Sequence, residues 1–446
     1  MKDLINRLMD VLGRENIDEI TISQAREIVK DINEYLYSYF DDLGTTFALN
    51  EEIQYFSSFH KYWENNYKEI LNVCIDDAKC EKVADKLNDI YLLTDGNAFS
   101  DMYDTVGLSD EQICRVRILT ANQDFKGSRD FATLAEIYRS DPSIFDLQNI
   151  YEQPDNFLRE LKLTQLSQGD KRLKYAKNIA KYLIDKEVRE PFELYLKEQK
   201  NLETIRRELS SSNAGYGNKK TDMFLRDMVV LGVWKDPISF EKIDVASDIN
   251  TIKVALRTGI ISTAIPLVSS FLDIFSYQYE YIDEMNAKAW RRVWEIWKQK
   301  YPETTIMGPC LIDYFIYKIV GKQFCKETLY LFKCDDETHE FYWHSGRNKT
   351  CQICYNEGRR QKKAHAIKKI MPCSNDNGEI AIKETKVIKN NISGLGELRE
   401  CPFKSICGLD ENYIIKQPPQ SISIYGRTGW KDAYTKVGSG GGGIMA

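Results

Sequence analysis

The sequence lacks any run of roughly eighteen uninterrupted apolar residues, the length that a membrane-spanning helix needs. It has no proline before Pro142, which favours long helices in the first part of the chain. The acidic, amphipathic start at Met1 lacks the pattern of a secretion signal. These absences argue against a membrane protein and a secreted one, and we expect a cytoplasmic location.

Charge is unevenly distributed along the chain. The formal net charge is −6, and acidic residues clearly outnumber basic ones over residues 1–100. The reverse holds over residues 347–369, and we expect a basic helix between Cys354 and Cys373. Local positive charge attracts a phosphate backbone, although a basic run is also typical of a solvated helix face. We predict that four residues of this segment bind nucleic-acid backbone: Arg359, Arg360, Lys362 and Lys363.

Most of the 11 cysteines lie after residue 309. In a chain without a secretion pattern, such a group favours metal ligation over a disulfide framework. Cys351 and Cys354 have the two-residue spacing that lets both sulfurs face one ion. Together with Cys401 and Cys407 they predict a structural zinc site.

The fold class is predicted as mainly α, with two short strands where aromatic and apolar residues alternate over residues 328–355. Four parts are expected. They are an N-terminal helical domain over 1–110, a helix-hairpin-helix domain over 111–305, a Cys-rich, basic metal-binding domain over 306–430 and a flexible, glycine-rich tail over 431–446.

The segment Gly215-Tyr216-Gly217-Asn218-Lys219-Lys220 follows a Ser/Asn cluster and predicts a tight turn. Apolar residues at helical spacing precede and follow it: Leu202, Ile205 and Leu209, then Met223, Phe224, Met228 and Leu231. The pattern indicates a helix, a hairpin and a second helix. Backbone N–H groups of Gly215 and Gly217 can approach a phosphate, because no side chain intervenes.

A second helix start is predicted at Asp248, which occupies an N-cap position, with Gly259 at the matching C-cap. A lysine at a hairpin exit and an aspartate at a nearby helix start can meet over one cleft. Lys219 and Asp248 are therefore candidates for one shared site. The alternatives are that Lys219 only contacts phosphate and that Asp248 is only a cap; Asp222 and Asp244 are weaker candidates.

These residues resemble the helix-hairpin-helix DNA glycosylase superfamily, which includes endonuclease III and the 8-oxoguanine glycosylases, the archaeal kind among them. The family's Gly-x-Gly-x-Lys hairpin is matched by Gly215, Gly217 and Lys219. Its downstream signature of Asp, short helix, Arg, any residue and Gly is matched by Asp248, Arg257 and Gly259. The chain departs from the family in a longer segment between Lys219 and Asp248, and in Ala214 where a proline is usual.

Two earlier segments extend the likeness to about residues 112–300. Residues 117–124 look like the family's first core helix and its Gln-containing loop, and residues 171–179 resemble its Arg-x-x-x-Ala-x-x-Ile segment. In the family, the loop glutamine fills the gap left by an extruded base. The resemblance gives this role to Gln123 or Asn122, with a helix C-cap as the alternative.

The resemblance implies a two-lobed helical core and a DNA N-glycosylase, bifunctional with AP lyase activity, that flips a base out of double-stranded DNA. Lys219 would be the nucleophile and Asp248 its electrostatic and general-base partner, while Gly215, Gly217 and Lys220 would contact DNA. A nucleophilic amine must be unprotonated, so its pKa must fall below about 10.4, and Lys220 offers a like charge beside Lys219.

Several points stay open at this stage. Cys401-Pro402 resembles the iron–sulfur loop of endonuclease III, so an iron–sulfur cluster is the alternative to zinc. The target base is not specified, and both DNA repair and anti-phage defence are compatible. The alternative functions are a nucleosidase on a modified nucleoside or nucleotide, of the queuosine-salvage type, and a non-enzymatic DNA-binding protein.

Overall fold

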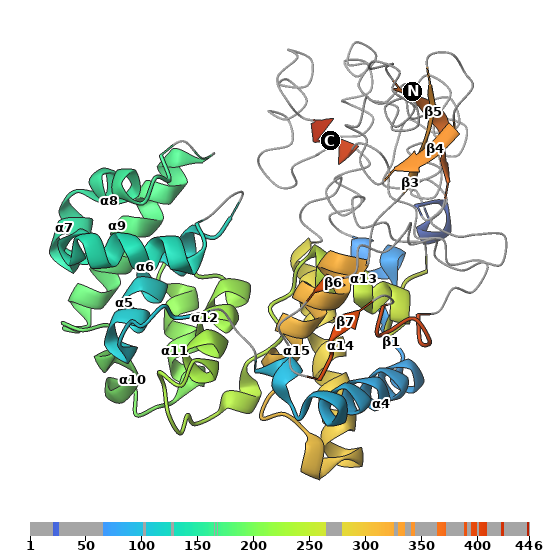
Figure 1. Ribbon diagram of the computed structural model, residues 1–446, viewed down its shortest axis with the longest axis horizontal. Helices are drawn as coiled ribbons and strands as arrows, with labels where there is room; N and C mark the ends of the chain where they lie inside the picture. Colours follow the sequence, from blue (N-terminus) through green and yellow to red (C-terminus); the bar gives the residue numbers. More distant parts are fainter. Residues whose placement is uncertain are drawn as a thin grey trace.

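The computed structural model describes part of the chain. The described residues are 21–25, 66–100, 104–125, 129–164, 166, 168–264, 279–324, 329–334, 340–343, 364–371, 388–389, 394–398, 401–407, 421–422 and 444–445. Helices dominate these residues and form two lobes (Figure 1). The prediction of a mainly α fold is therefore confirmed.

The first lobe is a bundle of helices in which α9 packs against α7, α8 and α5, and α11 against α12. Its helices are α5 (Asp110–Thr120), α6 (Phe131–Ser140), α7 (Leu147–Glu152), α8 (Pro154–Glu160), α9 (Gly169–Asp185), α10 (Glu193–Lys197), α11 (Leu202–Ser211) and α12 (Asn218–Val230). Short 3₁₀ turns, η3 (Ala121–Gln123) and η4 (Pro142–Phe145), join some of them.

The second lobe is built from segments on both sides of the first in sequence. Its helices are α4 (Asp77–Thr94), α13 (Ile249–Thr258), α14 (Tyr279–Lys300), α15 (Cys310–Tyr314) and the π-helical segment η9 (Phe315–Phe324). Short 3₁₀ turns also lie in or near this lobe: η2 (Asn97–Phe99), η5 (Phe240–Lys242) and η8 (Pro302–Thr304). Helix α4, from the range predicted as an N-terminal domain, packs along α14 (Figure 1).

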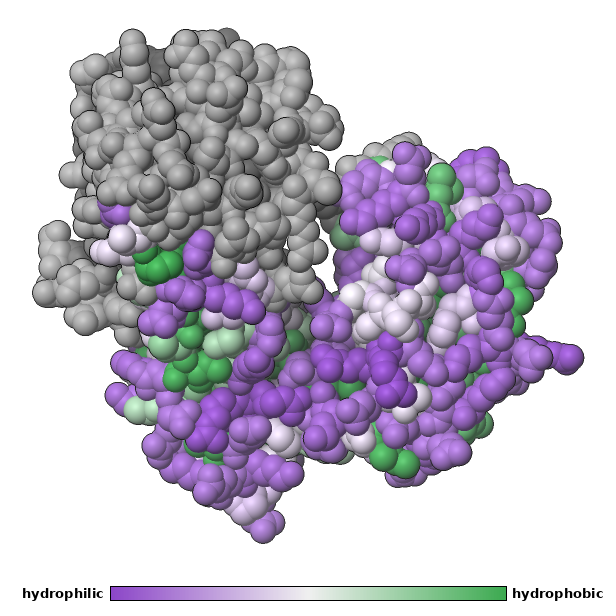
Figure 2. Space-filling model, turned by 180° about the vertical axis from the view of Figure 1, so that it is seen from behind, coloured by the Kyte–Doolittle hydropathy of each residue, from purple (hydrophilic) through white to green (hydrophobic). Residues whose placement is uncertain are grey.

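Each lobe has its own aromatic core. In the second lobe, Trp297 contacts Phe99 with ring centroids 5.2 Å apart, and Phe99 contacts Phe315 at 5.7 Å. In the first lobe, Tyr195 stacks on Trp234 at 4.8 Å. These rings bury a large apolar area, which is the main stabilising contribution to such cores. On the face seen in Figure 2, the described residues form a mostly hydrophilic surface.

The strands are short and antiparallel, and those after residue 324 include the predicted ribbon. β3 (Leu329–Cys334) pairs with β4 (Glu340–Trp343), so this prediction is confirmed. The other strands are β1 (Cys74–Ile75) with β2 (Ile261–Ser262), β6 (Ile388–Lys389) with β7 (Glu397–Leu398), and β8 (Ser421–Ile422) with β9 (Ile444–Met445).

The basic segment differs from its prediction. We expected a helix between Cys354 and Cys373, but residues 364–371 form strand β5 (Ala364–Met371), which pairs with β3. The error has a physical reason, because the β-branched Ile367 and Ile370 favour a strand that can pair along its length with a neighbour. Arg359, Arg360, Lys362 and Lys363 precede this strand and lie outside the described residues.

Candidate functional site

The predicted hairpin is present between α11 and α12. Leu202, Ile205 and Leu209 of α11 are fully buried, as the helical spacing predicts. Gly215 has φ +80°, in the left-handed region that favours glycine. A Cβ on Gly215 would also overlap the ring of Tyr175, which comes from α9. The turn is therefore restricted to glycine at this position by both its backbone and its neighbour.

Gly217 is different, although the same motif contains it. Its φ of −82° is available to any residue, and a Cβ there would meet no atom of the described chain within 4 Å. Gly217 is the N-cap of α12, and no side chain caps this helix start. The first N–H groups of a helix that lacks a side-chain cap can bind an anion. The second glycine thus leaves open the approach to the start of α12.

Lys220 points into the first lobe. Its Nζ donates to the carbonyl oxygen of Asn122 at 2.7 Å and lies 4.3 Å from the ring centroid of Phe125 and 5.5 Å from that of Tyr175. Burial lowers the pKa of Lys220 to about 8, and the positive charge of Lys171 contributes, while Asp124 opposes the shift. No local sequence pattern predicts this environment.

Lys219 lies about 100° around α12 from Lys220 and has an exposed side chain. Its charge acts on Asp313 of α15, in the second lobe. Burial raises the pKa of Asp313 to about 6; Arg226 lowers it, Asp248 raises it and Lys219 lowers it. Lys219 and Asp248 thus both contribute to the pKa of Asp313, in opposite directions.

Asp248 caps α13, as predicted. Its Oδ1 accepts the backbone N–H groups of Asn250 and Thr251, both at 2.9 Å, and the hydroxyl of Thr251 accepts the N–H of Asp248 at 2.9 Å. Gly259 ends the helix with φ +77°. The reciprocal bonds of this capping box fix the carboxylate, and the helix dipole favours a negative charge there.

Residues of η9 and of the loop after α5 meet at the same junction. Burial raises the pKa of Tyr317 in η9, and the carboxylates of Asp248 and Asp124 raise it further. A Cβ on Gly321 would lie 2.7 Å from the Cβ of Asn250, so η9 packs closely against the first turn of α13. The start of α13 is thus held by η9 as well as by its own cap.

Gln123 and Asn122, the candidates for filling the gap in DNA, are buried in the first lobe. Asn122 Nδ2 donates to the carbonyl oxygens of Tyr175 and Ala214 at 3.0 and 2.9 Å, and Gln123 Nε2 donates to that of Arg172 at 3.3 Å. The C-cap of α5 is Ala121. Both side chains join the loop to its neighbours, so inserting either one into DNA would require these bonds to break.

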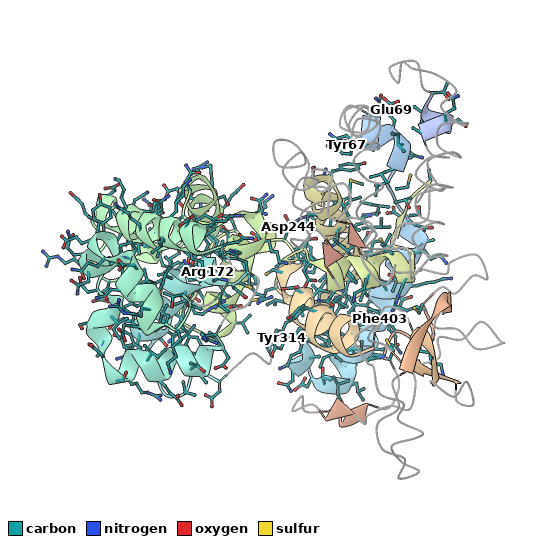
Figure 3. The ribbon with its side chains drawn as sticks, turned by 90° about the horizontal axis from the view of Figure 1, so that it is seen from above. Tyr67, Glu69, Arg172, Asp244, Tyr314 and Phe403 are labelled. Carbon is teal, nitrogen blue, oxygen red and sulfur yellow. The ribbon has the colours of Figure 1, made fainter. Side chains whose placement is uncertain are left out.

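Arg172, in the segment that resembles the family's Arg-x-x-x-Ala-x-x-Ile, completes this arrangement. It is fully buried, and its guanidinium donates to the carbonyl oxygens of Gln123 and Phe125 at 2.8 and 2.5 Å. Figure 3 shows it within the first lobe. Arg172 therefore holds the loop that lies next to the hairpin.

Asp222 and Asp244, the weaker candidates, belong to an ion-pair chain between the lobes. Asp222 is buried and accepts two bonds from Arg206 of α11, at 2.5 and 2.7 Å. Arg206 also contacts Asp244 at 3.4 Å, and Arg291 of α14 donates to Asp244 at 2.8 Å. Asp244 lies between the two lobes in Figure 3. Burial raises the pKa of Asp222 to about 7, although Arg206 opposes the shift.

Half of the predicted metal site is described. Cys401 and Cys407 are half-buried, and the N–H of Phe403 donates to Cys401 Sγ at 3.4 Å. The buried ring of Phe403 lies 6.3 Å from Phe315, which anchors this turn on the second lobe. Cys351 and Cys354 lie outside the described residues, and within those residues no three potential ligands come together.

Comparison with known proteins adds no relative, since the sequence matches neither a protein-family model nor a curated protein. Among the helices that the structure describes, none combines the length and the apolar character that crossing a membrane requires.

Proposed function

We propose that the chain is a DNA N-glycosylase with lyase activity, in which Lys219 is the nucleophile and Asp248 its electrostatic partner. One observation carries the proposal: Lys219 follows the hairpin on α12, Asp248 caps α13, and these two helices pack against the adjoining elements α15 and η9. These are the two residues that the family motif selects, and they belong to different lobes.

The chemistry requires an amine and a carboxylate at one sugar. Nζ of Lys219 attacks C1′ of the target nucleotide, and the bond from C1′ to the base nitrogen breaks; the base leaves with the electron pair and takes up a proton. Loss of a proton from the bound nitrogen and opening of the sugar ring then give a Schiff base, from which the strand can be cleaved. Asp248 stabilises the positive charge that develops on the sugar.

The hairpin supports binding to the DNA backbone. The start of α12 has no side-chain cap, and the space beside Gly217 is open. A phosphate at this point would accept bonds from backbone N–H groups, as is common at helix starts. Lys220 is engaged with Asn122 in the first lobe, so in this proposal it orders the loop that faces DNA. The proposal covers any target base and either biological setting, repair or defence.

A structural metal on Cys351, Cys354, Cys401 and Cys407 is part of the same proposal, with zinc preferred to an iron–sulfur cluster. The N–H bond to Cys401 Sγ supports it, because such a bond favours the thiolate that binds metal. Elemental analysis of purified protein is expected to find about one zinc per chain. Iron with a broad absorption band at about 400 nm would indicate an iron–sulfur cluster instead of zinc. Purified protein without bound metal would refute the site.

The test of function is an excision assay on duplexes that each contain one modified base, combined with borohydride reduction on abasic-site DNA. We expect release of at least one base and a covalent protein–DNA complex. Hydrolysis of a free modified nucleoside without any action on DNA would select the nucleosidase. Duplex binding without excision or trapping would select the non-enzymatic protein.

A further inference from the structure

Helix α12 presents Lys219 and Arg226 on one face, because residues seven positions apart complete about two turns. Nη1 of Arg226 donates to Oδ2 of Asp313 in α15, and both side chains are buried. Helices α12 and α15 also pack against each other. The face of α12 that carries Lys219 is therefore the face that contacts the second lobe.

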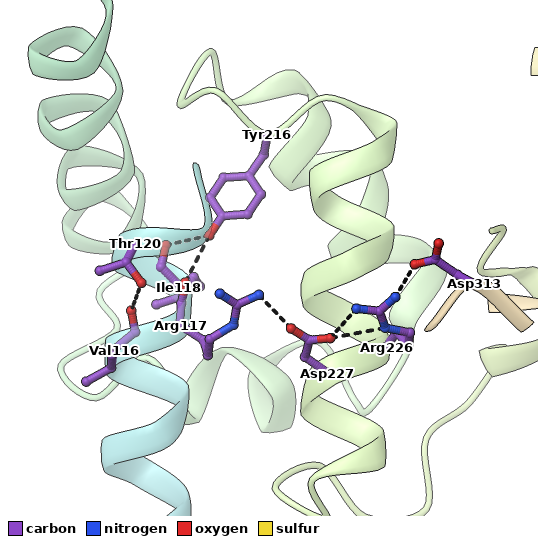
Figure 4. A network of polar contacts seen from close by, with 8 residues as sticks. All are labelled: Val116, Arg117, Ile118, Thr120, Tyr216, Arg226, Asp227 and Asp313. Atoms are coloured by element: carbon purple, nitrogen blue, oxygen red, sulfur yellow. Dashed lines mark hydrogen bonds and ion pairs between the residues drawn. The ribbon is translucent and has the colours of Figure 1, made fainter. Parts of the chain in front are cut away.

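Arg226 belongs to a buried network of alternating charges (Figure 4). Its Nε and Nη2 donate to Asp227 Oδ1 at 3.1 and 2.7 Å, and Asp227 Oδ2 accepts from Arg117 Nη2 of α5 at 2.5 Å. Two guanidinium groups and two carboxylates thus balance each other. Of these four groups, Asp313 is the one that belongs to the second lobe, so the Arg226–Asp313 pair connects this network across the junction.

The loss of one partner from a buried ion pair is costly, because the other charge stays buried and unbalanced. If Arg226 lost Asp313 as its partner, the contact that sets how α12 packs against the second lobe would be broken. A change of about 1 Å in the placement of reacting groups can reduce a rate by about 10²-fold. A change in the Arg226–Asp313 pair can therefore alter the relative placement of Lys219 and Asp248, which come from different lobes.

We infer that Asp313 is a positioning residue of the Lys219–Asp248 site: as a carboxylate it holds Arg226, and so keeps the Lys219 face of α12 against the lobe that carries Asp248. The inference rests on the proposed function for its kinetic consequences. It does not require Asp313 to touch DNA.

The inference has a pH signature. Burial raises the pKa of Asp313 to about 6, so the carboxylate is present above this pH and takes up a proton as pH falls through it. Arg226 then loses its partner, and excision falls on the acid side. The described groups that shift the pKa of Asp313 are Arg226, Asp227 and Lys219 of α12 and Asp248 at the start of α13. Asp313 in turn raises the pKa of Cys310 in α15 and of Tyr317 in η9.

The test is Asp313→Asn in the full chain, with single-turnover excision and duplex affinity measured from pH 5 to pH 8. We expect excision at neutral pH to fall about 10–100-fold, duplex affinity to change less than about twofold, and the acid limb near pH 6 to disappear. Asp313→Glu, which keeps the charge, is expected to restore part of the rate. Asp77→Asn is the control, since it removes an exposed ion pair with Arg292 elsewhere in the second lobe.

Hydrogen exchange supplies a readout that does not depend on catalysis. Asp313→Asn is expected to accelerate exchange in peptides covering α12 and α15, and Asp77→Asn is not. If the wild-type protein excises no base, the proposed function fails, while hydrogen exchange still tests whether the Arg226–Asp313 pair holds α12 against α15. Unchanged exchange in Asp313→Asn would overturn the inference, as would a wild-type rate that shows no acid limb near pH 6. Equal losses of binding and excision would show a merely structural role and would also overturn it.

Discussion

Helices α12 and α13 begin in opposite ways, and the difference indicates how the junction between the lobes works. Helix α12 begins at Gly217 with no side-chain cap and open space beside the glycine. Helix α13 begins at Asp248, whose carboxylate accepts the backbone N–H groups of Asn250 and Thr251. The start of α12 can bind an anion from outside the chain, whereas the start of α13 is already capped by the carboxylate of Asp248.

This contrast suits a site that binds DNA on one side and stabilises a cationic sugar on the other. A phosphate is attracted to an open helix start, whereas a fixed carboxylate stabilises developing positive charge. The two helices meet neighbouring elements, because Arg226 of α12 is paired with Asp313 of α15 and α13 packs against the adjoining η9. Four predictions test the contrast, beginning with the largest effect.

Lys219→Gln removes the amine at the open helix start and keeps a similar side-chain length. We expect excision and borohydride trapping to fall on the order of 10³-fold or more, while duplex affinity changes only a few-fold. Lys174→Gln, at an exposed lysine of α9 in the same lobe, is the matched control and is expected to leave all three measurements unchanged. Normal trapping by Lys219→Gln would remove Lys219 from the chemistry.

Asp248→Asn separates the two roles of the capped helix start. Asparagine caps a helix about as well as aspartate, so the folded structure is expected to persist, whereas excision is expected to fall by about 10²-fold because the charge is lost. Asp130→Asn, at the N-cap of α6, controls for the change in capping. Equal effects of the two variants on excision would mean that Asp248 is only a cap.

The two hairpin glycines are expected to respond differently to alanine. Gly215→Ala introduces strain at φ +80° and displaces Tyr175, so it should lower the free energy of unfolding by about 1–3 kcal/mol. Gly217→Ala is expected to lower stability by no more than about 1 kcal/mol, since alanine is a poorer N-cap than glycine, and to weaken duplex binding several-fold, because a methyl group would obstruct the phosphate.

Gly169→Ala is the control for the second glycine, since a Cβ there also meets no described atom within 4 Å. It should leave both stability and DNA affinity unchanged. If Gly217→Ala binds duplex DNA as the wild type does, the open helix start does not contact the backbone.

The smallest effect is expected away from both helix starts. Replacing Arg359, Arg360, Lys362 and Lys363 together by alanine should weaken binding to every duplex by a similar factor. The salt dependence should become shallower by up to ~0.9 log–log units for each phosphate that the variant no longer neutralises. Discrimination between target and normal bases should survive, because in the proposed mechanism the pocket for the flipped base would set it. Unchanged affinity and salt slope would mean that this cluster is a solvated face.

Local rules made parts of this fold predictable from the sequence. The hairpin, the start of α13 at Asp248 and its end at Gly259 follow from capping and turn preferences that act over a few residues. The helix predicted near residue 364 was wrong, since strand pairing with β3, a partner distant in sequence, decides that segment.

The surroundings of the candidate site could not be predicted in the same way. Nothing local predicts the contact of Arg226 with Asp313, because it depends on how α12 packs against α15. Arg226 carried a weak signal, as it lies seven residues after Lys219 and so shares its face. The burial of Lys220 beneath Phe125 and Tyr175 also depends on tertiary packing.

The two adjacent lysines allow the most direct test. Lys220 has a pKa lowered to about 8 by burial, which makes it the amine that general chemical reactivity would favour. Lys219 is the one on the face of α12 that carries Arg226 and packs against the second lobe, which holds Asp248. Wild-type protein should therefore be reduced with borohydride on abasic-site duplex, digested and analysed by mass spectrometry. The account predicts that the reduced sugar is attached to Lys219, and attachment to Lys220 or to another lysine would contradict it.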